Sequence, residues 1–391
     1  MPNIRRGMMA AAGAGAAGGA TNTPFANAYY GLWGNYNTNG WLGQDDETGV
    51  SSPVQVGDHI WKYMKAGCFE QPYVTGIKTD GTLWMWGDGG TGQLGQGNTT
   101  NYSSPVQVGS LTDWFQMGMA DGGEVTIAVK TDGTLWTWGK GGDGGLADGT
   151  TTDRSSPVQA GSLTNWGDGN FSIENNKRLN GGDRTCGCVK TDGTLWMWGL
   201  NNEGQLAQGD ITNRCVPVQV GSATNWLQID GGREYMIYLN TDGEIWGTGD
   251  NRYGVLGDGS STNRCSPVQA GSATDWVDLA AGYTGVAAIN SSGELYTWGL
   301  NEYGQLGLGD TTSRCIPVQV GSLTDWKYVS ATRRSMTAVK TDGTCWTWGE
   351  DRWRPAETDS SSPVQVGSRT DYTWTFKPGG QGGNVGSSAT I

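Results

Sequence analysis

One phrase recurs along the whole chain at a nearly constant interval, and this periodicity constrains the fold more than any other feature. Successive copies of PVQVG or PVQAG are separated by 52, 52, 60, 50, 50 and 46 residues. The seven copies begin at Pro53, Pro105, Pro157, Pro217, Pro267, Pro317 and Pro363. A period near 50 residues indicates one repeat array rather than the two or three domains that a length of 391 residues would suggest.

Each repeat is predicted to contain four short strands. The PVQ phrase is expected to be the first, with its proline at the strand start, where no ladder N–H is lost. The second follows a TDW or TNW phrase, the third is an alternating apolar run such as VTIAVK (125–130), and the fourth is TLWTWG (134–139). Between the last two, Asp132-Gly133 predicts a tight hairpin turn with positive φ at both central residues. Strands this short at this period are typical of propeller blades.

The two ends of the chain predict how the array closes. The phrase YYGLWG (29–34) is interpreted as a Trp-Gly strand without a PVQ partner, and residues 363–377 as a first and second strand without a Trp-Gly partner. Joined, they complete a seventh blade and leave no open sheet edge. The predicted fold is all-β: a single seven-bladed β-propeller over residues 28–377, closed by a blade shared between the N- and C-terminal strands. A Gly/Ala-rich arm (1–27) precedes it, and a Gly/Ser-rich tail (378–391) follows it.

Tryptophan supplies most of the large apolar side chains, with 20 residues against 5 phenylalanines. Two tryptophans spaced by two on a strand point to the same face. We interpret that face as the contact between neighbouring blades, because indoles bury a large apolar area. The alternative interpretation is a ring of aromatic cages for sugars.

Composition excludes several classes of function. The net charge of −13 argues against nucleic-acid binding, and no apolar run reaches the length of a membrane span, so no membrane insertion is expected. The cysteine count is seven, an odd number. Cys215, Cys265 and Cys315 occupy a position that holds serine in other repeats, which indicates a need for a small residue rather than a disulfide. Cys186 and Cys188 lack an accompanying His/Cys cluster, so we expect no metal site.

Catalysis has few candidate residues. The single histidine, His59, has no evident activated partner. Most carboxylates stand in repeated turns and are interpreted as structural: Asp80, Asp132, Asp192 and Asp342. The Gly-rich stretch at 139–145 lacks the Lys-Ser/Thr of a phosphate-binding loop. We therefore predict a protein that is not an enzyme and has no cofactor.

Partner binding is expected where the repeat is broken. The first break is the N-terminal arm, which can also be read as a twin-arginine export signal. The second is an insertion at 168–181, whose alternative is a polar surface loop without a role. The third is the segment 349–363, where the tryptophan can instead fill the gap left by a missing leucine. The candidate partner-binding residues are Arg5, Arg6, Met8 and Met9 in the arm, Phe171, Ile173, Lys177 and Arg178 in the insertion, and Arg352, Trp353 and Arg354 in the third segment.

The combination of TDGTLWTWG, GQLGQG and PVQV resembles the regulator of chromosome condensation repeat family over about residues 28–377. The resemblance implies a seven-bladed propeller closed by a blade from both termini. It also implies diverse functions: a guanine-nucleotide exchange factor, a plant ultraviolet-B photoreceptor, ubiquitin-ligase modules and a bacterial β-lactamase inhibitor. Fold alone does not choose among them. The family's Gly-Gly-x-x-His phrase lacks its histidine here, as in GGREYM (231–236) and ATRRSM (331–336), and the photoreceptor's Gly-Trp-Arg-His-Thr phrase is absent.

The start MPNIRRGMMAAAG, the closely similar repeats and the Gly-rich tail resemble propeller proteins of tailed, particularly marine, bacteriophages, which are predicted virion components. We therefore expect a non-enzymatic virion protein, attached to tail or capsid through its arm. Its partners would be other virion proteins or a host-surface component. The alternative is a secreted or envelope-associated bacterial binding module, such as an enzyme inhibitor, with an extracellular or periplasmic location. An exchange-factor-like regulator is disfavoured by the missing histidine and the acidic charge.

Overall fold

The computed structural model describes residues 9–14, 28–34, 37–48, 50–56, 61–67, 72–119, 124–167, 177–350, 359–365, 372–376 and 386–389. Apart from one short 3-10 helix, η1 (Thr38–Gly40), the described elements are all β-strands. The prediction of an all-β protein is therefore confirmed. No helix within these ranges has the length and apolar character needed to cross a membrane.

Six sheets in the described part each contain four antiparallel strands that are consecutive in the sequence. The first three consist of β4 (Trp61–Gly67), β5 (Tyr73–Lys78), β6 (Leu83–Gly87) and β7 (Tyr102–Gln107); β8 (Trp114–Met119), β9 (Val125–Lys130), β10 (Leu135–Gly139) and β11 (Arg154–Gln159); and β12 (Leu179–Gly181), β13 (Thr185–Val189), β14 (Leu195–Gly199) and β15 (Arg214–Gln219). The next three consist of β16 (Trp226–Gly231), β17 (Tyr235–Asn240), β18 (Ile245–Gly249) and β19 (Arg264–Gln269); β20 (Trp276–Ala281), β21 (Gly285–Asn290), β22 (Leu295–Gly299) and β23 (Arg314–Gln319); and β24 (Trp326–Ala331), β25 (Ser335–Lys340), β26 (Cys345–Gly349) and β27 (Ser360–Gln365).

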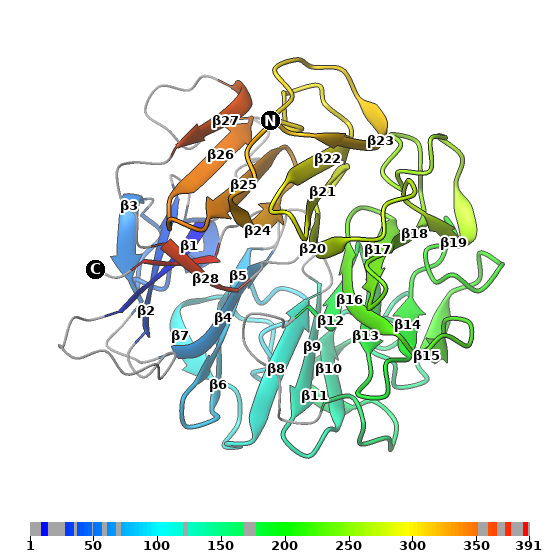
Figure 1. The fold of residues 1–391 in the computed structure, drawn as a ribbon. Coiled ribbons are helices and arrows are strands. Elements are labelled where there is room, and N and C mark those ends of the chain that lie inside the picture. Colours follow the sequence, from blue (N-terminus) through cyan, green and yellow to red (C-terminus); the bar gives the residue numbers. More distant parts are fainter. Residues whose placement is uncertain are drawn as a thin grey trace, which may run out of the picture.

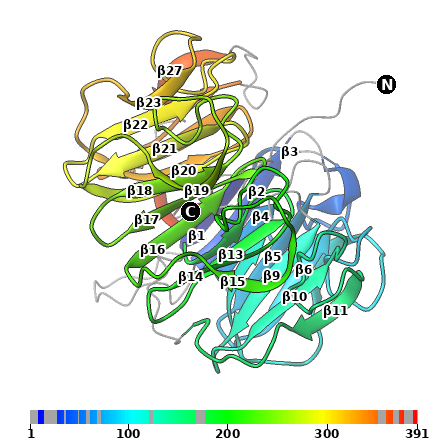
Figure 2. The ribbon, with the colours of Figure 1, turned by 90° about the vertical axis from the view of Figure 1, so that its right-hand side faces the viewer.

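The sheets follow one another around a common centre (Figure 1). The first strand of each sheet is the innermost, and β4, β8, β12, β16, β20 and β24 contact one another in that order. Seen from the side in Figure 2, the green β16–β19 sheet lies between the yellow β20–β23 sheet and the cyan β8–β11 sheet. Side chains on the innermost strands therefore meet at the centre, and those on the outer strands form the rim.

A five-stranded sheet draws on both ends of the chain. Its strand order is β28 (Tyr372–Phe376), β29 (Gly386–Ala389), β1 (Met9–Ala14), β2 (Ala28–Gly34) and β3 (Val50–Gln55). Strand β1 pairs antiparallel with β2 and parallel with β29. The segments that precede and follow the repeats thus each add one strand to this sheet.

The repeat begins one strand later than the sequence predicted. The PVQ phrase forms the last strand of a sheet and not the first: β11, which carries Pro157, pairs with the Trp-Gly strand β10. At the N-terminus, β2 pairs with β3 and so does not lack a PVQ partner. Likewise β27, which carries Pro363, pairs with β26. The reason is the connection after the Trp-Gly strand, such as the Gly-rich loop between β10 and β11, which returns the chain antiparallel so that the following PVQ phrase becomes its neighbour.

The Asp-Gly turn has one positive φ rather than the two that were predicted. Gly133 has φ 77°, whereas Asp132 is not among the residues with positive φ. The Gly133 N–H donates to the Lys130 carbonyl (2.9 Å), and Asp132 Oδ1 accepts from the N–H and hydroxyl of Thr134 (3.0 and 2.6 Å). This is a type I turn completed by a left-handed glycine. A Cβ on Gly133 would lie 2.0 Å from the Thr164 carbonyl oxygen, so the position also lacks space for a side chain.

The two tryptophans of a Trp-Gly strand have different environments. Trp138 is fully buried, packs with Tyr73 of the preceding sheet and donates its indole N–H to the Gln93 carbonyl there (2.8 Å). Trp136 is half-buried and donates to the Thr134 hydroxyl of its own hairpin (2.9 Å). The predicted contact between neighbouring repeats is therefore confirmed for the second tryptophan, while the first is held within its own sheet.

Candidate functional site

Most residues predicted to bind partners lie outside the described part of the chain. These are Arg5, Arg6, Met8, Phe171, Ile173, Arg352, Trp353 and Arg354. Met9 opens β1, where its backbone is paired with Trp33. Lys177 and Arg178 lie immediately before β12 and are half-buried. A role for these residues in partner binding remains a prediction.

The Lys177 side chain contacts the innermost strand β20. Its Nζ donates to the Leu279 carbonyl (2.9 Å) and contacts the Asp278 carboxylate. Its backbone carbonyl accepts from the Ile229 N–H of β16 (2.8 Å). Burial lowers the pKa of Lys177 to about 7. Lys177 therefore ties β16 to β20 at the centre.

A second chain of buried polar contacts crosses the centre. Lys65 Nζ on β4 donates to Asn180 Oδ1 on β12 (2.8 Å), and the Asn180 amide donates to Asp230 on β16. The second carboxylate oxygen of Asp230 accepts from the Ala281 N–H on β20 (2.6 Å). We call Lys65, Lys177, Asn180, Asp230 and Asp278 the central network. Its hydrogen bonds link the sheets across the centre, and its charges are matched.

Three further polar side chains on innermost strands are buried without complete hydrogen bonding. Both polar atoms of the Gln116 amide, Gln228 Oε1 and Ser330 Oγ have no hydrogen-bond partner within the described ranges. Such atoms are usually satisfied by ordered water.

Two buried cysteines, Cys186 and Cys188, are poorly suited to nucleophilic chemistry. Burial raises the pKa of the Cys188 thiol to about 12 and raises that of Cys186 as well, so neither thiol readily forms the nucleophilic thiolate. Within the ranges that the structure describes, no three His, Cys, Asp or Glu side chains group as metal ligands.

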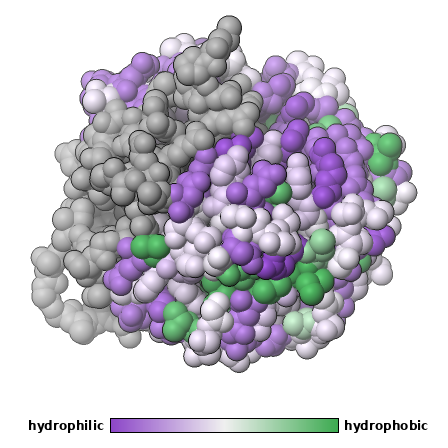
Figure 3. All heavy atoms as spheres, turned by 90° about the horizontal axis from the view of Figure 1, so that it is seen from above, coloured by the Kyte–Doolittle hydropathy of each residue, from purple (hydrophilic) through white to green (hydrophobic). Residues whose placement is uncertain are grey.

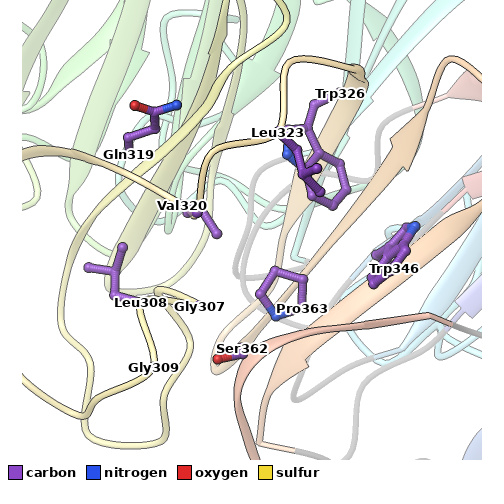
Figure 4. A pocket seen from close by; sticks show the side chains of 11 residues that line it. Gly307, Leu308, Gly309, Gln319, Val320, Leu323, Trp326, Trp346, Ser362 and Pro363 are labelled. Atoms are coloured by element: carbon purple, nitrogen blue, oxygen red, sulfur yellow. The ribbon is translucent and has the colours of Figure 1, made fainter.

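Two cavities lie at equivalent positions on the rim, each beside the linker that joins two neighbouring sheets. The first, of about 310 Å³, lies between the β20–β23 and β24–β27 sheets (Figure 4). The second, of about 460 Å³, lies between the β16–β19 and β20–β23 sheets. We name them the Lys340 groove and the Asn290 groove after the residue that ends the second strand of the sheet beside each, β25 and β21.

The grooves share an aromatic wall and an unused hydrogen-bond donor. Trp326 meets Trp346 edge-to-face at 6.1 Å between centroids, and Trp276 meets Tyr296 in the same way at 5.0 Å. The indole nitrogens of Trp276 and Trp326 are buried and have no partner among the described residues. In Figure 4, the Trp326 nitrogen lies on the side of the ring near Leu323, and both residues line the cavity.

Apolar side chains extend the grooves outward to solvent. Leu323 in the Lys340 groove is 43% exposed, and Ile316 in the Asn290 groove is 52% exposed. Hydrophobic residues also interrupt the largely hydrophilic face seen in Figure 3. Exposed apolar surface beside an aromatic cavity is a common feature of protein-binding surfaces. The sequence showed the TDW and Trp-Gly phrases that form the aromatic walls, where packing between repeats was the favoured interpretation and aromatic cages for sugars the alternative.

Comparison with known proteins identifies the repeats. A family model described as "Regulator of chromosome condensation (RCC1) repeat" matches residues 80–129, 192–239, 242–289 and 292–339, and a second with the same description matches 276–305. Together they match about half of the chain.

Curated relatives match over part of their length. The ultraviolet-B receptor UVR8 of Arabidopsis thaliana is 33% identical over 190 residues, 48% of this chain and 41% of that protein. The E3 ubiquitin-protein ligase HERC2 of Homo sapiens is 32% identical over 133 residues, 34% of this chain and 3% of that protein. The chain thus spans less than half the length of these relatives.

Solved structures share the fold. Yeast RCC1 (Prp20) bound to Kap60 matches with a TM-score of 0.70 at 17% identity, covering 88% of this chain and 86% of that one. Prp20p from Saccharomyces cerevisiae, crystallised in a study of its binding to Gsp1p and histones, matches with a TM-score of 0.70 at 16% identity, covering 96% and 90%. The chain is therefore a β-propeller protein of the regulator of chromosome condensation (RCC1) repeat family.

Proposed function

We propose that this chain is a non-enzymatic, protein-binding propeller that serves as a structural component of a bacteriophage particle. Its N-terminal arm attaches it to tail or capsid, and its rim contacts other virion proteins or the host surface. The observation that carries protein binding is the pair of rim grooves, each with an aromatic wall, an unpaired indole N–H and an exposed aliphatic side chain. The phage assignment is supported by the resemblance of the N-terminal phrase and the closely similar repeats.

In this proposal the propeller has seven blades, and the five-stranded sheet is the seventh. Its strand β28 contacts β4 on one side and β25 on the other. Strands from both chain ends would thus close the ring and leave no free edge between the first and last four-stranded sheets.

Binding rather than catalysis is supported by the state of the charged groups at the centre. The Lys177 ammonium and the Asp278 carboxylate satisfy each other, and Asp230 accepts hydrogen bonds at both oxygens. Groups paired in this way hold the sheets together, and in this proposal the centre is structural. Propellers of this family are also seen with protein partners, since Prp20 is bound to Kap60 in its crystal structure.

The proposal is tested on particles purified from the native source, with intact-mass and cross-linking mass spectrometry. The expected result is a chain that begins at residue 1 or 2 and cross-links through its N-terminal arm to a tail or capsid protein. A chain recovered free of particles and beginning near residue 16 or 19 would overturn the virion assignment and indicate an exported binding module.

The contribution of the rim is tested with a matched pair of variants. Leu323→Asp places a charge in the Lys340 groove and should reduce the amount of chain incorporated into particles. Val277→Asp alters a residue that is 50% exposed and lines neither groove, so incorporation should stay unchanged. Equal incorporation of the two variants would exclude the Lys340 groove from the contact.

A further inference from the structure

Four repeats place the ammonium group of their own lysine over both aromatic side chains of a rim site. Lys340 Nζ lies 5.1 Å from the centroid of Trp326 and 4.6 Å from that of Trp346, within the range of cation–π attraction. It also lies 3.4 Å from the Asp325 carboxylate. The same stacking is made by Lys78 over Trp61 and Trp84, by Lys130 over Trp114 and Trp136, and by Lys190 over Trp166 and Trp196.

The Asn290 groove keeps the aromatic pair but has no lysine. Asn290 occupies the position of Lys340, and Glu294 occupies the position of Thr344. The Glu294 carboxylate accepts hydrogen bonds from the Asn290 amide (2.7 Å) and the Tyr296 hydroxyl (3.2 Å). Burial, reinforced by this carboxylate, raises the pKa of Tyr296, so its hydroxyl stays protonated and continues to donate.

The Asn290 groove is larger and more acidic than the Lys340 groove. The Asn290 groove has a volume of about 460 Å³ against about 310 Å³ for the Lys340 groove. Asn290, Glu294 and Asp275 line the larger cavity, whereas none of their counterparts lines the smaller one. Asp275 corresponds to Asp325, the ion-pair partner of Lys340. Among the described residues, no Lys or Arg forms an ion pair with Asp275 or Glu294.

We propose that the Asn290 groove binds the ammonium group of a lysine side chain supplied by a protein partner. The ammonium would lie against Trp276 and Tyr296, where four other repeats hold their own lysine, and would be neutralised by Asp275 and Glu294. The aromatic pair and the two carboxylates together select a cation over a neutral group.

A lysine residue fits better than a free amine because of the indole N–H of Trp276. Trp276 is only 5% exposed, and its nitrogen has no partner among the described residues. A donor of this kind suits a carbonyl oxygen, which the backbone of a peptide supplies beside its lysine side chain. Ile316, at the edge of the groove, provides apolar contact for the lysine methylenes. The inference rests on the proposed protein-binding function for the source of the lysine, whereas the pocket itself can be tested alone.

The test exchanges the residue pairs Asn290/Glu294 and Lys340/Thr344 between the two grooves. Asn290→Lys/Glu294→Thr gives the groove its own ammonium and uses the residue pair found at Lys340 and Thr344. Lys340→Asn/Thr344→Glu makes the reverse change. Because the protein already folds with each pair, both variants are expected to fold, which the thermal unfolding midpoint checks.

Binding is measured from indole N–H resonances of ¹⁵N-tryptophan-labelled protein, with those of Trp276 and Trp326 assigned by their Phe variants. The probe is acetyl-Gly-Lys-Gly-amide, and the control is acetyl-Gly-Gln-Gly-amide. The lysine peptide should shift the Trp276 resonance saturably, and the glutamine peptide should not. Asn290→Lys/Glu294→Thr should weaken binding at least about tenfold, the order expected from losing roughly 1.4 kcal/mol. Lys340→Asn/Thr344→Glu should add a saturable shift at Trp326.

Equal shifts with the two peptides, or unchanged binding by Asn290→Lys/Glu294→Thr, would overturn the inference. This failure is distinguishable from failure of the proposed function. Saturable binding of the peptide to a protein that is absent from particles removes the virion assignment alone. Normal association with particles without peptide binding removes the lysine site alone.

Discussion

The centre and the rim of this molecule use buried charge in different ways. On the rim, Lys130 and its counterparts repeat the same contact, an ammonium group over two aromatic rings. At the centre, one position on the innermost strands carries a different residue in successive sheets: Lys65, Gly118, Asn180 and Asp230. The repeated contact lies within single sheets, in four of the repeats, and the unequal contacts join specific sheets to one another. The residue at this central position therefore distinguishes one sheet from the next and determines which sheets are joined.

The central residues depend on one another across intervening sheets. Lys65 on β4 reaches Asn180 on β12, although the β8–β11 sheet stands between their strands in the ring order. Gly118 on β8 occupies the position in between, and a Cβ there would lie 2.8 Å from the Leu179 carbonyl oxygen. A small residue at one strand thus accommodates a long one at its neighbour.

The largest effect is expected from breaking the central network. Asp230→Ala should lower the free energy of unfolding by about 3–5 kcal/mol, because it leaves the buried Asn180 amide and the Ala281 N–H without their acceptor and removes a buried negative charge. Asp325→Ala is the rim control: its side chain is 40% exposed and pairs with Lys340 at 3.4 Å, so its loss should cost less than about 1 kcal/mol. Urea unfolding measures both, and equal losses would remove the distinction between centre and rim.

A smaller effect is expected from crowding the centre without removing a charge. Gly118→Ala should lower stability by about 1–3 kcal/mol, since the added methyl group meets the backbone of Leu179. Gly142→Ala is the matched control, because a Cβ there has no neighbour within 4 Å. Comparable melting temperatures for the two variants would show that the approach of β8 to β12 tolerates a methyl group.

The inter-sheet indole bond of the outer layer should contribute less again. Trp138→Phe removes the bond to the Gln93 carbonyl and should cost about 0.5–1.5 kcal/mol, since that oxygen keeps the Thr126 hydroxyl as a donor. Trp348→Phe is the control, because the Trp348 nitrogen has no hydrogen-bond partner in the described part of the chain. A chevron or urea titration should therefore rank Trp138→Phe as the more damaging change, and the opposite ranking would contradict the role given to the bond.

The smallest effect concerns acid stability of the hairpin turns. The Thr hydroxyl in each turn lowers the pKa of Asp80, Asp132 and Asp342, and the corresponding threonine contributes to the same shift at Asp192. A depressed carboxyl pKa gives stability that is present above the unfolded-state value and lost as the pH falls through the folded-state value.

Replacing these four aspartates with asparagine keeps an oxygen acceptor but removes the titration. The variant should have nearly wild-type stability at pH 7 and a shallower loss of stability below about pH 4, the unfolded-state range for aspartate. Melting temperatures measured across that range provide the check. An unchanged loss of stability at acid pH would show that other titrating groups cause most of it.

Much of the scaffold was predictable from the sequence because the same contacts recur in several repeats. The period, the alternating apolar runs and the Asp-Gly pair predicted short antiparallel strands, and the tryptophan spacing predicted packing between repeats. The prediction of which strand begins the repeat was wrong, because a period specifies the spacing of the repeats but not where each one begins. Pairing of β11 with β10 is decided by the intervening loop, which the phrase alone does not reveal.

The functional features were less predictable because each occurs once. Lys177 was assigned to an exposed loop from its place in an insertion, and only three-dimensional contact brings it to Asp278, about 100 residues away. Asp230 likewise differs from the residues at the same strand position in the other repeats, and nothing else in its strand is unusual. The signal for the Asn290 groove was present in the looser repeat phrases that begin with asparagine, where lysine and threonine are replaced together by Asn290 and Glu294.

Native-state hydrogen exchange tests most directly the claim that the centre joins the sheets into one unit. The account predicts that the most protected amides of β9, β13, β17 and β21 exchange through one common opening with a single free energy. Asp230→Ala should lower that value in these strands together. A separate exchange free energy for each sheet in the wild-type protein, with Asp230→Ala affecting β16 and β17 alone, would contradict the account, since it would show sheets held only by contacts between nearest neighbours.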